Sequence, residues 1–202
     1  RKGSLLEYVV IGVIVAIIPL FSIFIQGFAT LGNLRVIASN SAALVILSCG
    51  MGMVIISRGL DLSLVAAMVA GATVFAVLIN AGCSAPVVIV GTLLAVIAIG
   101  FANGWLIAYV EIPAMLATLA SAMAITGLFR FGVLRGEFLL LLPKTNPAVV
   151  FFSRDIVPGL TAPAALMIVT FLLTWVLLRF TTLGRITYAM GDNFQAARLT
   201  GF

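Results

Sequence analysis

Long apolar segments separated by short polar turns make up most of this chain. A transmembrane helix needs roughly 17 to 25 mostly apolar residues, whereas a transmembrane β-strand needs about ten residues of alternating polarity. The segments are of the first kind, so the pattern predicts an all-α fold, a polytopic transmembrane helical bundle with about six membrane segments in a single domain over residues 1–202. Their approximate bounds are 8–25, 36–56, 64–79, 86–110, 113–131 and 162–178.

The connections between these segments hold most of the polar residues. A short polar connection over residues 32–35 precedes the second segment. Pro86, Pro113 and Pro163 stand in the first turns of later segments, where a helix does not need the missing N–H. The longest interruption, residues 133–160, predicts a surface loop with one short interfacial helix.

The composition agrees with a membrane protein, because 63% of the residues are hydrophobic and only 8% are charged. The eleven Lys and Arg residues give a net charge of +5. They are scattered at segment ends, so we expect contacts with lipid headgroups and no nucleic acid partner. The chain has no His and two cysteines, Cys49 and Cys83, which excludes a disulfide framework, predicts no metal site and leaves the redox compartment open.

An even number of crossings would place both ends of the chain on one side of the membrane. In that arrangement six basic residues lie on the side of the termini and five on the opposite side. The positive-inside rule therefore favours cytoplasmic termini by a small margin only. We expect a multi-pass protein of the cell inner membrane with cytoplasmic termini, mainly because of the motifs described below.

Polar, small and capping residues are concentrated in the tail over residues 179–202. Asp192 and Gln195 have the D-x-x-Q spacing of a capping box, and Gly201 suits the position after a helix end. The pattern predicts a helix over residues 193–200, which would be ~12 Å long. Because so short a helix is marginal alone in water, we expect it to need a docking surface.

The tail resembles a known signature. Gln195-Ala196-Ala197-x-x-x-Gly201 is similar to the EAA-x-x-x-G signature of permease subunits of ATP-binding-cassette importers, with glutamine in place of glutamate. The preceding stretch, 181–193, resembles the ribose, xylose and galactose branch of monosaccharide importers. Further motifs resemble the same branch: Gly50-Met51-Gly52-Met53-Val54-Ile55-Ile56 (GMTLVI), Gly59-Leu60-Asp61-Leu62-Ser63 (GGIDLS), Asn103-Gly104 (NG), and Ile112-Pro113 with Thr118-Leu119 (I-P-x-x-x-x-T-L).

The resemblance covers about residues 33–202 and has departures. Arg58 stands where the branch usually has glycine, and Thr126-Gly127 stands where it usually has Arg-Gly, with Arg130 one turn later. Members of the family continue through further helices, so we expect this permease chain to be truncated.

The resemblance implies that the tail carries a short coupling helix that inserts into a groove of a cytoplasmic ATPase. The docking residues that it implies are Gly191, Asp192, Asn193, Gln195, Ala196, Ala197, Arg198 and Gly201. The chain has no G-x-x-x-x-G-K-S/T motif, so we expect a transport subunit that is not an enzyme and binds no cofactor itself, with ATP and Mg in the partner subunit. The other implied partners are a periplasmic or lipid-anchored solute-binding protein, a second permease copy or homologue, and membrane lipid.

Each candidate residue also has a simpler interpretation. Asp192 and Gln195 could merely cap a surface helix, and Arg58 and Asp61 fit an interfacial turn. Asn103, inside a Gly-x-x-x-Gly pair, is typical of helix–helix contacts. Sugar hydroxyls nevertheless need hydroxyl and amide partners, which makes four residues candidates for the substrate path: Asn40, Ser41, Asn103 and Thr118.

The favoured function is therefore ATP-driven import of a monosaccharide. The same machinery could instead carry a furanone signal, a nucleoside or a branched-chain amino acid. An ion-coupled carrier or channel is a second class, but the interiors of the six segments hold no Asp, Glu, Lys or Arg, which argues against proton coupling and leaves backbone-bound sodium open. A purely structural membrane anchor would not require polar, glycine-broken helices.

Overall fold

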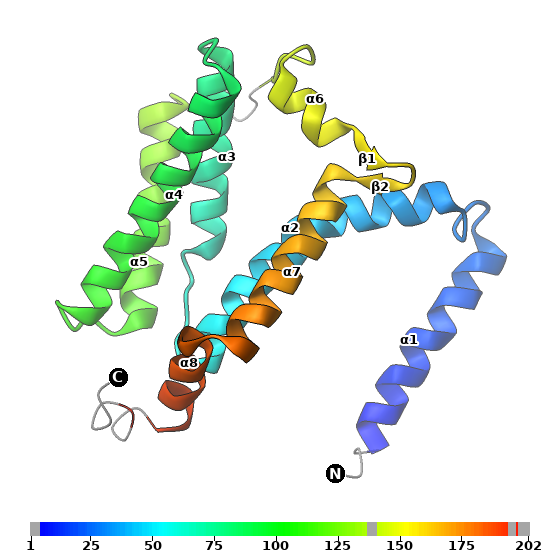
Figure 1. Cartoon of the computed structure of the whole chain (residues 1–202), viewed down its shortest axis with the longest axis horizontal. Helices are drawn as coiled ribbons and strands as arrows, with labels where there is room; N and C mark the ends of the chain where they lie inside the picture. The colour runs from blue at the N-terminus through cyan, green and yellow to red at the C-terminus, as the bar shows by residue number, and fades with distance from the viewer. Residues whose placement is uncertain (1–4, 137–140, 194–196, 198–202) are drawn as a thin grey trace.

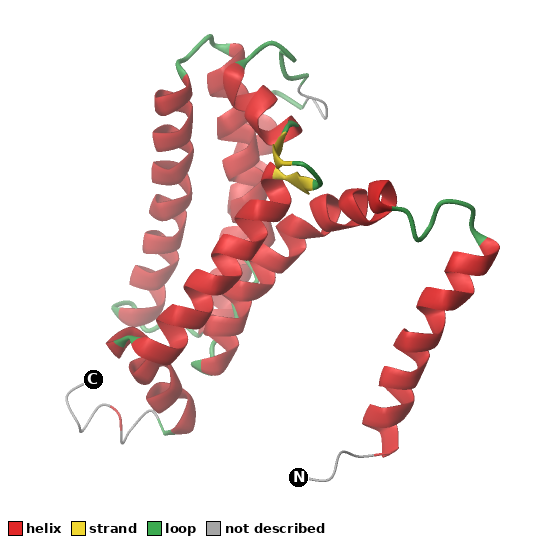
Figure 2. Ribbon diagram, turned by 45° about the vertical axis from the view of Figure 1, so that its right-hand side comes forward, coloured by secondary structure: helices red, strands yellow, loops and turns green. Residues whose placement is uncertain are grey.

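The computed structural model describes residues 5–136, 141–193 and 197, and most of them are helical (Figures 1 and 2). A two-stranded antiparallel hairpin lies before the last long helix. The elements are α1 (Leu5–Phe24), α2 (Leu31–Ile56), α3 (Leu64–Asn80), α4 (Ala85–Ala108), α5 (Ala114–Gly127), the π-helix η1 (Leu128–Val133), α6 (Pro147–Ser153), β1 (Asp155–Val157), β2 (Leu160–Thr161), α7 (Ala162–Phe180) and α8 (Thr182–Asp192).

The all-α, polytopic character predicted from the sequence is confirmed. Within the described residues, four helical stretches are long and apolar enough to cross a membrane: Leu31–Ile56, Ala85–Ala108, Ala114–Val133 and Ala162–Phe180. Two shorter apolar helices, Val15–Phe24 and Leu64–Asn80, accompany them. Six crossings therefore stay a prediction, which requires α1 and α3 to span as well.

Two groups of helices can be distinguished in Figure 1. In the first group α3 packs against α4 and α5, and in the second α2 lies along α7, with α8 against the end of this pair. Helices α2 and α3 contact each other over a short stretch only, and the turn 57–63 joins them. Helix α1 stands apart from both groups (Figures 1 and 2).

Successive long helices alternate in direction (Figure 1). The start of α1, the end of α2 and the end of α7 consequently lie at one end of the bundle, together with α8. We call this the α8 end. The opposite end carries α6 and the hairpin. This arrangement agrees with both chain ends on one side, and the assignment of that side to the cytoplasm stays a prediction.

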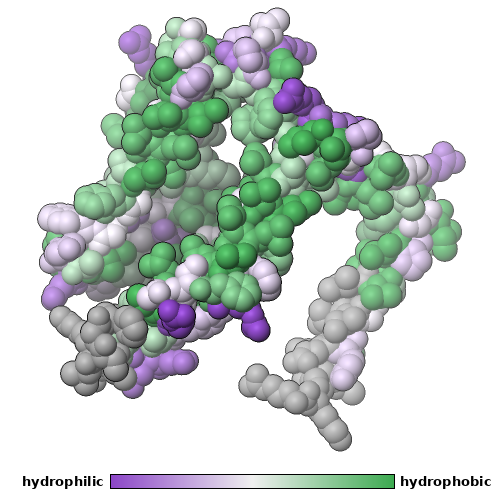
Figure 3. Space-filling model, in the orientation of Figure 1, coloured by the Kyte–Doolittle hydropathy of each residue, from purple (hydrophilic) through white to green (hydrophobic). Residues whose placement is uncertain are grey.

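Small side chains dominate the helix contacts. The buried residues include Ala70 and Ala76 of α3 and Ala117 of α5. Gly71 lies so close to α4 that a Cβ there would be 2.9 Å from Val96 Cγ2. Such residues let helix backbones approach each other closely. Close packing matters in a membrane, because lipid tails are as apolar as the side chains and no hydrophobic effect drives the helices together. Large apolar side chains face outward instead (Figure 3), as expected of surfaces that contact lipid.

The second segment begins earlier than the sequence pattern predicts. Residues 32–35 are helical and not a polar connection, because α2 starts at Leu31. Thr30 provides the reason, since its Oγ1 accepts a hydrogen bond from the Asn33 N–H at 3.3 Å and caps the helix. The short helix predicted within residues 133–160 is present as α6.

The tail also differs from the prediction. Helix α8 occupies residues that the pattern left as a loop, and Thr181 Oγ1 caps it by accepting from Gly184 N–H at 3.3 Å. Asp192 is the last residue of α8, and its predicted capping of a following helix stays a prediction, because residues 194–196 lie outside the described part. Asn193 is extended, and its carbonyl accepts from the Ala197 N–H at 2.9 Å. The other predicted tail residues lie outside the described part: Gln195, Ala196, Arg198 and Gly201.

Candidate functional site

The turn 57–63 begins with a tight left-handed bend. Arg58 has φ +61°, in the region where glycine is favoured because it has no Cβ. The Gly59 N–H then donates to the Val54 carbonyl at 2.8 Å, and Ser57 Oγ donates to the same oxygen at 2.9 Å. A glycine would adopt this φ without strain, whereas Arg58 adopts it despite its Cβ.

The Arg58 side chain reaches across to α8. Its Nη2 donates a hydrogen bond to the main-chain carbonyl of Asp192 at 3.1 Å. One residue earlier, Gly191 lies against the last turn of α2, where a Cβ would overlap the carbonyl oxygen of Ile56. Two contacts therefore fix the end of α8 to the end of α2, and one of them requires a glycine.

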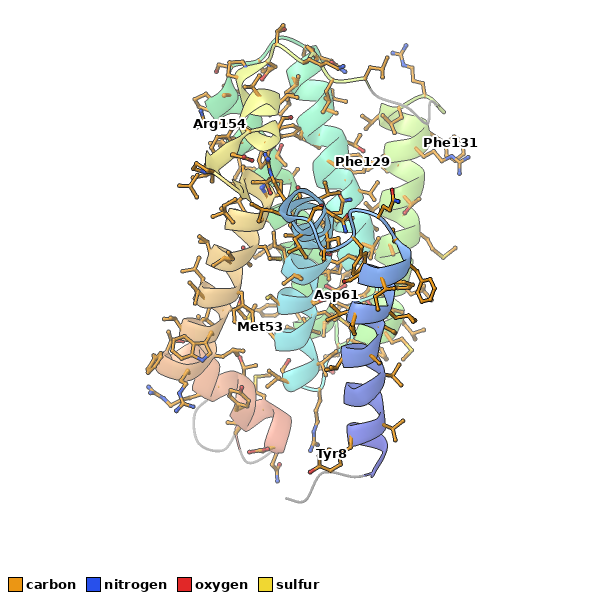
Figure 4. All side chains as sticks on the ribbon, turned by 90° about the vertical axis from the view of Figure 1, so that its right-hand side faces the viewer. Tyr8, Met53, Asp61, Phe129, Phe131 and Arg154 are labelled. Atoms are coloured by element: carbon orange, nitrogen blue, oxygen red, sulfur yellow. The ribbon has the colours of Figure 1, made fainter. Side chains whose placement is uncertain are left out.

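At its other end the turn is bonded to the α3–α5 group, and hydroxyl and carboxylate groups make these bonds. Asp61 Oδ1 accepts from the Ser63 N–H at 2.8 Å and from Ser63 Oγ at 2.6 Å (Asp61 is labelled in Figure 4). Ser63 Oγ in turn accepts from Asn103 Nδ2 of α4 at 2.7 Å. Ser63 and Asn103 are 1% and 6% exposed, so this is a buried polar link between the turn and α4.

A second buried link runs to α5. The Leu62 N–H donates to Thr118 Oγ1 at 3.1 Å, and that hydroxyl donates to the Ala114 carbonyl at 2.7 Å. Thr118 is 1% exposed. Buried polar groups are costly unless they are bonded, so these partners hold the turn in one position against α4 and α5.

Motifs that lie far apart in the sequence converge here. The turn 59–63, Asn103 and Thr118 form one network, and Arg58 connects it to residues 191–192 of α8. Sequence analysis identified these motifs separately and did not predict that they meet. In this conformation Asn103 of α4 binds Ser63 of the turn, and its contact with a solute stays a prediction.

The other two candidates for the substrate path lie elsewhere. Asn40 is exposed on α2 and lines a hollow of about 290 Å³ together with Arg35, Ser39 and Thr161. Ser41 is the next residue on α2 and is half-buried. The structure therefore brings Asn103 and Thr118 together at the turn, whereas Asn40 and Ser41 lie elsewhere on α2.

Two features of the structure were missed by sequence analysis. Arg35 of α2 forms an ion pair with Asp155 of β1, which connects α2 with the hairpin. The opposite charges in the sequence did not indicate which residues would pair. A hollow of about 840 Å³ lies in the corner between α7 and α8. Its lining includes Trp175, Arg179, Phe180, Arg185, Tyr188 and Asp192. Basic and aromatic residues near a membrane helix end are the signal that could have indicated it.

Long apolar helices in two groups, joined by a buried polar turn at one end, define a polytopic membrane protein. The chain belongs to the family described as the permease component of branched-chain amino acid transport systems, whose family model matches residues 33–202.

Curated relatives share the family's transport character. The autoinducer 2 import system permease protein LsrC of Salmonella paratyphi B is 38% identical over 122 residues, which are 57% of this chain and 32% of the relative. The protein of the same name from Photorhabdus luminescens is 35% identical over 125 residues, 57% of this chain and 34% of the relative. The matches thus span about a third of the relatives' length. No solved structure matches the chain.

Proposed function

We propose that this chain is the membrane-spanning subunit of an ATP-driven importer and forms the translocation path for a monosaccharide delivered by a solute-binding protein. The observation that carries the proposal is the family match over residues 33–202, which includes both the turn 57–63 and the tail. The resemblance of the tail to the sugar-importer branch supports the choice of cargo.

In this proposal the tail that follows α8 docks into a cytoplasmic ATPase, which binds ATP and Mg. The docking residues are the eight implied by the resemblance, and four of them are described: Gly191 and Asp192 end α8, Asn193 follows it, and the Ala197 N–H donates to the Asn193 carbonyl. The α8 end would then face the cytoplasm. A second permease copy or homologue and membrane lipid would cover the exposed apolar helix faces.

A furanone signal is the second candidate cargo, and a specific observation favours it. The curated relatives above are named as autoinducer 2 import permeases. The family description, in contrast, names branched-chain amino acids. Cargo selection in such systems rests largely on the solute-binding protein, so we expect the three cargoes to be separated by transport measurements and not by the fold.

The test is ATP-dependent uptake by the intact transporter in proteoliposomes, with its own ATPase and solute-binding protein. Radiolabelled ribose, xylose and galactose are compared with autoinducer 2 and leucine. The proposal expects uptake of a pentose or hexose that needs ATP inside the vesicle. Uptake of autoinducer 2 alone would replace the cargo, and solute movement that follows an ion gradient without ATP would overturn the importer assignment.

A further inference from the structure

We propose that the turn 57–63 carries the movement of the ATPase-docking tail into the α3–α5 group, and that Arg58 is the positioning residue that fixes this turn to α8. This inference rests on the proposed function, because it presupposes a tail that moves when ATP is bound. The contact concerned is the hydrogen bond from Arg58 to the Asp192 carbonyl, which connects the turn with α8.

The first step is the division of the described helices. Helices α2, α7 and α8 form one group and α3, α4 and α5 the other, and α2 and α3 contact each other only over a short stretch. At the α8 end the turn 57–63 is the covalent connection between the groups (Figure 1). A second connection lies at the opposite end, where α6 packs against α3 through Phe152 and Phe75 and contacts α7. A displacement of α8 therefore reaches the α3–α5 group first through the turn 57–63, because α6 lies at the far end of both groups.

The second step is the attachment of the turn to α8. The 3.1 Å hydrogen bond from Arg58 Nη2 to the Asp192 carbonyl couples the turn to the last residue of α8, directly before the docking tail. Gly191 lets the end of α8 lie directly against the Ile56 carbonyl of α2, where a Cβ would overlap that oxygen. A guanidinium with several donors in a fixed fork holds a carbonyl in a defined direction better than a flexible ammonium does.

The third step is the attachment of the turn to the α3–α5 group. Asn103 of α4 and Thr118 of α5 bind Ser63 Oγ and the Leu62 N–H, respectively, at 2.7 and 3.1 Å. Both side chains are buried, so breaking these bonds leaves polar groups without water. The turn is therefore held at this end by buried bonds, and at the other end the exposed side chain of Arg58 bonds it to α8. The bonds to α4 and α5 are therefore stronger than the bond to α8, and the Arg58 side chain can be removed without disturbing the core.

The experiment replaces Arg58 in the intact transporter. Arg58→Gly removes the side-chain link and suits the φ of +61°, so the variant is expected to fold and to retain the ATPase on purification. Coupling is measured as ATP hydrolysed per solute imported. We expect a several-fold rise in this ratio for Arg58→Gly and a smaller rise for Arg58→Lys, which keeps the charge.

The matched control is Arg135→Gly. Arg135 also has a positive φ, of +51°, and lies after η1 at the opposite end of the bundle. Its replacement is expected to leave the ratio unchanged. If Arg58→Gly transports with the wild-type ratio and retains the ATPase, the inference is overturned while the proposed function stands. If the wild-type transporter shows no ATP-dependent uptake, the proposed function fails and the inference fails with it.

A second readout follows the movement itself. Spin labels at two exposed positions, Leu183→Cys on α8 and Met123→Cys on α5, report the distance between the groups in a background without Cys49 and Cys83. In the wild type we expect this distance to change when a non-hydrolysable ATP analogue is added. In Arg58→Gly we expect a different change in this distance, because α8 then moves without the α3–α5 group that carries the second label. Identical distance changes in both proteins would contradict the inference.

Discussion

Arg58 and Asp192 are 134 positions apart in the chain, and a single hydrogen bond joins the guanidinium of the first to the main-chain carbonyl of the second. The bond connects the α2–α3 turn with the end of α8. Because the acceptor is a backbone carbonyl, the contact depends on where α8 ends and not on the identity of the side chain at position 192. The consequences of this joint, and of the buried network behind it, can be tested separately.

Removing the amide of Asn103 tests the link to α4. Asn103→Ala leaves the Ser63 hydroxyl without its buried donor, which typically costs about 1–3 kcal/mol of stability. We expect a lower midpoint of thermal unfolding in detergent. The matched control is Asn40→Ala, since Asn40 is exposed on α2 and its loss is expected to leave the midpoint unchanged. Equal midpoints for both variants would contradict the importance of the buried amide.

Two threonines of α5 allow a paired test of the second link. Thr118 and Thr126 each donate to the carbonyl four residues earlier, at 2.7 Å in both cases, but Thr118 Oγ1 additionally accepts from Leu62 N–H. Thr118→Val is expected to destabilise the protein by about 1–3 kcal/mol, because the Leu62 N–H loses the buried hydroxyl that accepts its hydrogen bond. Thr126→Val is expected to have a much smaller effect. Urea unfolding followed by tryptophan fluorescence measures the difference.

A side chain at position 191 is expected to displace α8. In Gly191→Ala the new Cβ would overlap the Ile56 carbonyl, which is main chain and cannot turn aside. We expect reduced uptake and faster proteolysis between α7 and α8. Gly100→Ala is the control, because nothing lies within 4 Å of the position where its Cβ would stand. Unchanged uptake in Gly191→Ala would show that α8 tolerates a different position.

The docking tail is tested by association with the ATPase. Gly201→Trp places a bulky side chain at the end of the signature, and we expect it to abolish co-purification of the ATPase and solute uptake. Asp192→Ala is expected to weaken both to a smaller extent, because the carbonyl bonded to Arg58 is retained. Wild-type association and uptake for Gly201→Trp would remove the basis for the coupling assignment.

The ion pair between Arg35 and Asp155 is expected to contribute little. The two side chains are 40% and 26% exposed, and pairs of this kind are worth about 0–1 kcal/mol because water and salt screen them. Arg35→Gln is therefore expected to lower stability by less than about 1 kcal/mol at low salt, and by still less at 1 M salt. A larger loss that persists in salt would indicate a structural role beyond the pair.

Local chemistry made several features predictable. The apolar segments gave the helical, membrane-spanning character and most helix positions, because lipid-facing helices must be long and apolar whatever their neighbours are. The start of α2 was placed five residues late, at 36 and not at 31, since the Thr30 cap was not recognised. Helix α8 was missed because its polar face resembles a loop when only average polarity is considered.

The sequence by itself determined the class of protein, its helical segments and the motifs that mark its family, because each of these depends on residues close together in the chain. Only the tertiary structure decided that the turn 57–63, Asn103, Thr118 and the end of α8 form one joint. Such contacts depend on the relative placement of elements that are far apart in the chain, since the bonded residues are separated by 40, 56 and 134 positions. Periodicity describes one helix at a time and contains no information on that placement.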